Sequence, residues 1–160
     1  MSDFGARLIR RLQAAADRNQ QVLEKNQGAK DKLAKVLPIL EKDLQGNQIA
    51  LAAMREVYNL LEADAEVRQS TIAELKEARD LLEKSATLLE QAGFDFSNIQ
   101  QFSNDEIWLG DHLPTIKRVV DIVNLQKLEV ALDEADKERF EDFAHAVKRS
   151  GEKRERVARQ

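Results

Sequence analysis

The residues with the types and spacing for metal chemistry are the two histidines and the acids around them. Asp142 and His145 lie three positions apart, which on a helix places a carboxylate and an imidazole on one face. Di-iron sites in helical bundles need two such pairs, together with acids from two further helices. The second histidine, His112, has Leu109 three positions before it. Because the template is only half matched, we interpret Asp142 and His145 as surface neighbours on an amphipathic helix.

A second group of oxygen and imidazole ligands surrounds His112. Its acids are of the type that hard cations prefer, but their spacing matches no calcium loop. Acids at helix starts also have a structural role, since they stabilise the positive end of the helix dipole. We assign this group to capping and solvation, and keep a metal-binding bundle protein as the second alternative function. The group comprises Asp95, Asp105, Glu106, Asp111 and His112.

The glycines and cysteines exclude several classes of enzyme. The six glycines lie at positions 5, 28, 46, 93, 110 and 151, whereas phosphate-binding loops and nucleophile elbows need clustered glycines. Cysteine is absent, which removes disulfides, thiolate metal sites and cysteine nucleophiles, and fits a reducing compartment. We therefore expect a protein that is not an enzyme, with no cofactor and no small-molecule substrate.

Aromatic side chains concentrate in the segment 93–114, where four of the eight aromatic residues fall. In the interpretation we favour, these rings plug the end of a bundle, since each ring buries a large apolar area. In the other interpretation they are exposed anchors for a protein partner, because Trp and Phe concentrate binding energy at interfaces. The four are Phe94, Phe96, Phe102 and Trp108.

Positive charge collects at the end of a chain whose net charge is -4. Six basic residues lie after position 147 and face two glutamates, Glu152 and Glu155. This basic tail, or an N-terminal amphipathic helix carrying Phe4, Leu8 and Leu12, is a candidate for docking on anionic lipid. The interleaved glutamates dilute the charge, so nucleic acid is not an expected partner. The basic tail comprises Lys148, Arg149, Lys153, Arg154, Arg156 and Arg159.

The element that must position these residues is a long helix over residues 44–89. Apolar residues alternate there at three and four positions over more than six heptads, which is typical of a coiled-coil seam. The composition agrees, with 42% hydrophobic and 34% charged residues and only 2 prolines. The two interleaved series are Leu51, Tyr58, Ala65, Ile72, Arg79, Ala86 and Met54, Leu61, Arg68, Leu75, Leu82, Leu89.

Polar residues interrupt this seam. Asn47, Arg68 and Arg79, with Asn19 and Asn26 on the preceding segment, occupy positions that call for apolar side chains. A buried Asn fixes helix register, and a seam Arg needs a carboxylate or a route to the surface. Asp64 lies four residues before Arg68 and Glu83 four after Arg79, so local pairing is available to both. A register role and partial solvation both account for them.

The chain boundaries follow from Gly and Pro. We expect a first helix from about residue 2, a kink at Pro38, and a chain reversal at Gly28 or, preferably, at Gly46, since glycine tolerates the left-handed conformation that ends helices. The pair Asp111 and Pro114 predicts the start of a last helix that continues to Val147.

We therefore predict an elongated, antiparallel all-α bundle of three or four helices with one unusually long helix. It forms a single domain over residues 1–150, followed by a charged, frayed tail over 151–160. The expected function is a non-enzymatic, cytoplasmic scaffold or adaptor that binds proteins and forms homo-oligomers, since its seam is longer than a monomer of this size covers. Peripheral membrane docking is the alternative.

Overall fold

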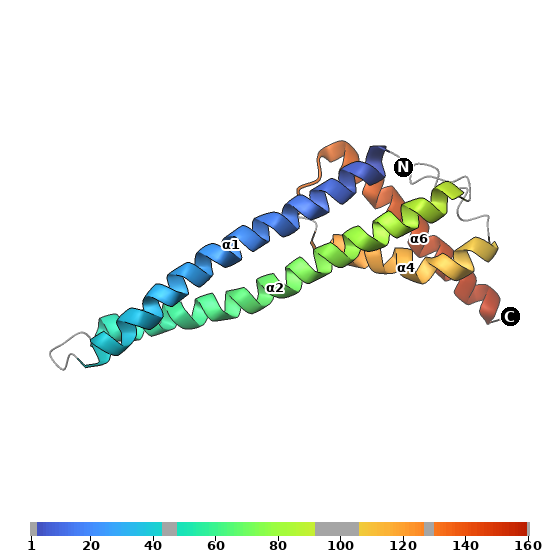
Figure 1. Ribbon diagram of the computed structural model, residues 1–160. Coiled ribbons are helices and arrows are strands. Elements are labelled where there is room, and N and C mark those ends of the chain that lie inside the picture. Colours follow the sequence, from blue (N-terminus) through green and yellow to red (C-terminus); the bar gives the residue numbers. More distant parts are fainter. Residues whose placement is uncertain (1–2, 43–47, 92–105, 127–129, 160) are drawn as a thin grey trace. The chain divides into compact units, whose positions relative to one another are not determined.

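The protein is an all-α bundle in which two long helices precede two shorter ones (Figure 1). The computed structural model describes residues 3–42, 48–91, 106–126 and 130–159, and within these it contains no strand. The predicted fold class is confirmed: α2 has 44 residues and covers nearly the whole predicted range 44–89, and α1 has 39. The helices are α1 (Asp3–Glu41), α2 (Gln48–Gln91), α4 (Glu106–Leu125) and α6 (Glu134–Ala158).

Helix α1 contains both Gly28, a predicted reversal point, and Pro38, the predicted site of a kink. Gly28 lies inside α1, so the helix does not end there. Nothing lies within 4 Å of the position that a Cβ on Gly28 would take. Pro38 lacks an N–H and removes one hydrogen bond, but α1 ends at Glu41, only three residues later. Of the two predicted reversal points, Gly28 is wrong; the chain reverses between Glu41 and Gln48, and Gly46 lies outside the described residues.

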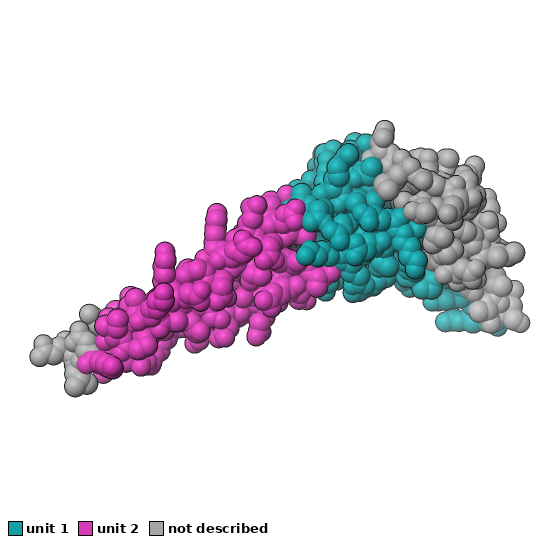
Figure 2. Space-filling view, in the orientation of Figure 1, with its two compact units in different colours: residues 1–15, 74–160 teal, residues 16–73 magenta. Residues whose placement is uncertain are grey.

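The chain divides into two compact units (Figure 2). Unit 1 contains residues 1–15 and 74–160, and unit 2 contains residues 16–73. Both units include parts of α1 and α2, so the single domain over residues 1–150 stays a prediction.

Unit 1 holds most of the hydrophobic core. The apolar residues of the N-terminal amphipathic helix belong to this core, since Phe4, Leu8 and Leu12 are buried. Helix α4 buries a broad apolar arc, and α6 packs against it. The rings of Phe140 and Phe143 on α6 lie 6.3 Å apart in a tilted arrangement. The other buried apolar residues of this unit are Ala15, Leu75, Ala78, Leu82, Ile116, Val119, Val120, Ile122, Val123, Val130, Leu132 and Val147.

The second half of the chain differs from its prediction at two helix boundaries. The last helix was predicted to start near Asp111, but α4 begins at Glu106 and includes part of the predicted connecting segment 93–114. That helix was also predicted to continue to Val147, whereas α4 ends at Leu125 and α6 starts at Glu134. Ala131 lies between them with φ 52°, a left-handed conformation that no helix interior contains. Helix α6 then continues through Gly151 to Ala158, so most of the predicted tail 151–160 is helical.

Unit 2 is an antiparallel pair formed by the second part of α1 and the first part of α2 (Figure 1). Its seam is thin, because two helices alone cannot enclose side chains on all sides. Ala16 and Ile72 are its buried apolar residues among those described. The remaining predicted seam residues are only half-buried, including Leu51, Met54, Tyr58 and Leu61.

Candidate interaction surface

Unit 2 exposes a set of large aliphatic side chains that do not belong to its seam. Ile49 is 89% exposed, Ile39 69%, Val67 65% and Leu60 63%. Monomeric proteins expose single apolar residues routinely, but a row of them along one helix indicates a binding surface. We call this set the apolar face; it consists of Val36, Ile39, Ile49, Val57, Leu60 and Val67.

These side chains gather on one side of the helix pair. Successive helical residues are rotated by about 100°, and on α2 this places Val57, Leu60 and Val67 roughly a third of a turn from the seam residues. On α1, Val36 and Ile39 are rotated from the seam by a similar angle in the same sense. Because the two helices are antiparallel, equal rotations bring both rows to the same side of the pair.

The charges on this side differ between the two helices. On α1 the residues beside Val36 and Ile39 are basic: Lys25, Lys32 and Lys35 are all exposed and share that side. On α2 the corresponding side carries the exposed Glu56 and the half-buried Asp64. The apolar face is therefore bordered by positive charge on α1 and by negative charge on α2.

A polar network crosses the seam of unit 2 and fixes its register. Nη1 of Arg68 donates to Oδ1 of Asn19 over 2.8 Å, and Nε of Arg68 donates to Oδ2 of Asp64 over 2.8 Å. The same Oδ2 accepts a hydrogen bond from Nδ2 of Asn26 over 2.9 Å. Asn19 is buried, which is unusual for an amide side chain. The predicted pairing of Arg68 with Asp64 is confirmed, and the network links two residues of each helix.

Charged contacts continue this register toward the end of the helix pair. Nζ of Lys30 lies 3.5 Å from Oε1 of Glu62 and 5.2 Å from the ring centre of Tyr58. Glu41 near the end of α1 forms an ion pair with Arg55 on α2. Along these contacts and the polar network, residue numbers rise on α1 while they fall on α2, as in an antiparallel pair. The contacts thereby fix which residues of α1 and α2 lie side by side in the apolar face.

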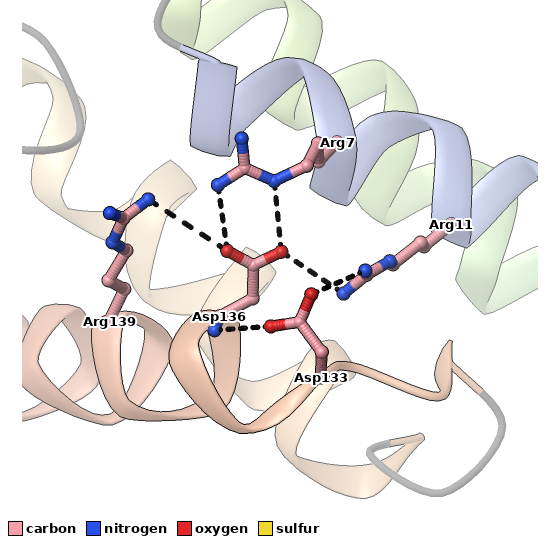
Figure 3. A network of polar contacts seen from close by, with 5 residues as sticks. All are labelled: Arg7, Arg11, Asp133, Asp136 and Arg139. Carbon is pink, nitrogen blue, oxygen red and sulfur yellow. Dashed lines mark hydrogen bonds and ion pairs between the residues drawn. The ribbon is translucent and has the colours of Figure 1, made fainter.

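Unit 1 contains an arginine–aspartate cluster that the sequence did not predict (Figure 3). Asp136 on α6 is buried, and Arg7 on α1 donates a hydrogen bond to each of its carboxylate oxygens. Nε of Arg7 donates to Oδ2 over 3.0 Å, and Nη2 donates to Oδ1 over 2.8 Å. Nη1 of Arg11 lies 3.1 Å from Oδ2 of Asp136, and Nη2 donates to Oδ2 of Asp133 over 3.0 Å. The third arginine of the cluster is Arg139, whose Nη1 lies 4.0 Å from Oδ1 of Asp136.

The cluster also caps α6. Oδ1 of Asp133 accepts a hydrogen bond from the backbone N–H of Asp136 over 2.8 Å, as an N-cap residue does. That bond and the hydrogen bond from Arg11 hold the pKa of the Asp133 carboxyl below its ordinary value. The hydrogen bonds from Arg7 outweigh burial and hold the pKa of Asp136 below its ordinary value as well. Both carboxylates are therefore held ionised by arginines, which is typical of a structural cluster rather than of a catalytic one.

The long helices are joined in unit 1 by the second seam arginine. Arg79 donates to Oε1 of Gln13 on α1, and its Nη2 lies 2.8 Å from Oδ1 of the adjacent Asp80. Helix α4 contacts α2 through Arg118, whose Nε and Nη2 each lie 3.1 Å from a carboxylate oxygen of Glu77. Arg79 therefore contacts Gln13 on the facing helix and Asp80 on its own helix, and its predicted register role stays a prediction.

Several predicted site residues lie outside what the structure describes. Phe94, Phe96, Phe102 and Asn47 are outside the described residues, so both interpretations of the aromatic segment stay open. Trp108 lies in α4, but its side chain is not described. In the basic tail, four side chains are described and exposed on the last turns of α6 and just beyond: Lys148, Arg149, Arg156 and Arg159; Lys153 and Arg154 lie on α6 without described side chains.

The two groups that the sequence offered as candidate metal ligands are described only in part. Asp142 and His145 are both exposed on α6. Among described residues, no three His, Asp or Glu side chains are close enough to hold a metal ion. Asp95 and Asp105 lie outside the described residues, and the side chains of Glu106, Asp111 and His112 are not described.

None of the protein's described helices combines the length and the hydropathy that crossing a bilayer requires. Comparison with known proteins identifies no matching family model, no matching curated protein and no matching solved structure.

Proposed function

We propose that this protein is a non-enzymatic helical scaffold or adaptor that acts by presenting the apolar face of unit 2 to protein partners. The observation that carries the proposal is the row of exposed aliphatic residues along α2, with Ile49, Leu60 and Val67 each more than half exposed. A helix pair that faced only water would carry polar residues on that side. We place the protein in the cytoplasm, because a chain without cysteine fits a reducing compartment.

The polar network supports the same function. A two-helix pair without such a network can slide by one heptad, since apolar seams are repetitive. The hydrogen bonds among Asn19, Arg68 and Asp64 oppose sliding, because any shift leaves buried polar groups unpaired. A binding surface that spans two helices needs a fixed register, and here the network supplies it.

The experiment is affinity capture from the cells of origin with the full chain and two glutamate variants. Leu60→Glu places a charge on the apolar face, whereas Asn59→Glu places one on the exposed opposite side at nearly the same level. We expect partners that wild type and Asn59→Glu enrich equally and that Leu60→Glu loses. Identical enrichment by all three chains contradicts the proposal.

A second candidate function is docking on anionic lipid through the basic end of α6. The exposed Arg156 and Arg159 favour it, and exposed Lys148 lies on the same helix. The N-terminal route has less support, because Phe4, Leu8 and Leu12 are buried in unit 1. Binding to vesicles rich in acidic phospholipid at low salt, abolished by Arg156→Glu with Arg159→Glu, supports this candidate; no binding at low salt removes it.

A further inference from the structure

We infer that the partner on the apolar face is a second copy of this chain. The two copies pack so that α1 of one lies over α2 of the other, with the Glu41 and Gln48 ends of both helix pairs at the same level. This inference rests on the proposed function and names its partner. The two helix pairs then form a four-helix bundle around a two-fold axis parallel to the helices. The contact is isologous, so it closes at two copies.

Charge selects this arrangement among the ways in which two such faces stack. The α1 side of the face carries Lys25, Lys32 and Lys35, and the α2 side carries Glu56. Stacking α1 on α1 and α2 on α2 brings the lysine rows against each other. Stacking α1 on α2 brings each lysine row against the partner's Glu56, so like charges separate and opposite charges meet.

The heights of the residues along the helices agree with the charges. The contacts Asn26–Asp64 and Lys30–Glu62 set the register, and counting from them along both helices places Ile39 on α1 level with residues 51–53 on α2, which include Ala53. An axis parallel to the helices preserves these levels, so Ile39 of one copy meets Ala53 of the other. By the same count, Glu56 lies level with residues 34–36, which include Lys35.

The test uses the absence of cysteine from the natural chain, which allows single cysteines to be introduced without background. Two full-length variants, Ile39→Cys and Ala53→Cys, are mixed and mildly oxidised, and covalent dimers are quantified on non-reducing gels. A disulfide forms only where two Cβ atoms approach closely. We expect about tenfold more covalent dimer from the mixture than from either variant alone, because packing raises the effective concentration of the two thiols.

The matched control mixes Asp31→Cys with Asn59→Cys, which lie at one level on the exposed opposite side of the helix pair. We expect this mixture to form no more covalent dimer than its separate components. Efficient linking of the control pair, or of Ile39→Cys to itself, overturns the arrangement. A wild-type chain that stays monomeric in sedimentation overturns self-association. The proposed function then still stands or falls by whether capture depends on Leu60.

Discussion

Arg68 on α2 and Asn19 on α1 form a 2.8 Å hydrogen bond across the seam of unit 2, between residues 49 positions apart in the chain. The Nε of the same guanidinium also donates to Asp64, which in turn accepts from Asn26. Two residues that interrupt an apolar seam in the sequence are thus each other's partners in the fold. Their hydrogen bond sets which residues of α1 and α2 lie level with one another, and hence the layout of the apolar face.

Replacing Asn19 with leucine tests this hydrogen bond. Asn19→Leu lowers the free energy of unfolding by about 1–3 kcal/mol, because Nη1 of Arg68 loses Oδ1 of Asn19 as its acceptor. The double variant Asn19→Leu with Arg68→Leu recovers that loss, since an apolar pair replaces the polar one. Urea unfolding followed by circular dichroism measures both. A single variant more stable than wild type would refute the role assigned to the bond.

Asp136 is expected to be the most sensitive polar residue of unit 1. Asp136→Asn lowers the free energy of unfolding by about 1–3 kcal/mol, less than for a fully enclosed pair because Arg7 keeps 32% of its side chain exposed. The matched control, Asp142→Asn on the exposed side of the same helix, changes it by less than about 0.5 kcal/mol. Equal effects of the two variants would show that the cluster contributes nothing.

The cluster also predicts how stability depends on pH. Because folding lowers the pKa of Asp133 and of Asp136, their contribution is complete above the ordinary carboxyl pKa and disappears as the pH falls through it toward the lowered values. Stability should therefore decrease from about pH 5 to pH 3. In the double variant Asp133→Asn with Asp136→Asn this decrease becomes shallower, which thermal melts at several pH values measure. An unchanged slope would mean that other carboxyls dominate.

The backbone at Ala131 predicts a stabilising substitution. A left-handed residue with a Cβ is strained by about 1 kcal/mol, and glycine is not. Ala131→Gly should therefore raise the melting temperature. Ala135→Gly, in the first turn of α6, should lower it, since glycine in a helix costs about 0.5–1 kcal/mol. The outcome that contradicts this account is a loss of stability in both variants.

Local periodicity accounts for what the sequence predicted correctly. The seven-residue count identified the seam of α2, and Ile72, Leu75 and Leu82 from it are buried. The four-residue spacing of Asp64 and Arg68 predicted their contact. Both features depend only on neighbours within two helical turns, so the sequence contains all the information that they need.

The apolar face was missed because a seven-residue count follows one stripe at a time. Residues 49, 53, 57, 60 and 67 have the same spacing of three and four as the seam, but they start on another side of the helix. The sequence alone therefore contains this second apolar stripe. What the sequence could not show is that no described part of unit 2 covers it, because that depends on how the whole chain packs.

The arginine–aspartate cluster was missed for a different reason. Arg7 and Asp136 are 129 residues apart, and no local rule pairs residues at that separation. The break between α4 and α6 was missed because residues 126–133 contain neither Gly nor Pro, and apolar residues continue through them. One signal was available: Asp133 and Asp136 have the spacing of an N-cap and an acid in the first helical turn.

The molecular mass in solution tests whether two copies associate through the apolar face. Sedimentation equilibrium of the full chain at micromolar concentration should give twice 18.2 kDa for wild type and for Asn59→Glu. Leu60→Glu should give 18.2 kDa with unchanged helix content, because Leu60 contributes to the apolar face and not to the seam. A wild-type mass of 18.2 kDa, or a Leu60→Glu variant that remains dimeric, would show that two copies do not associate through the apolar face.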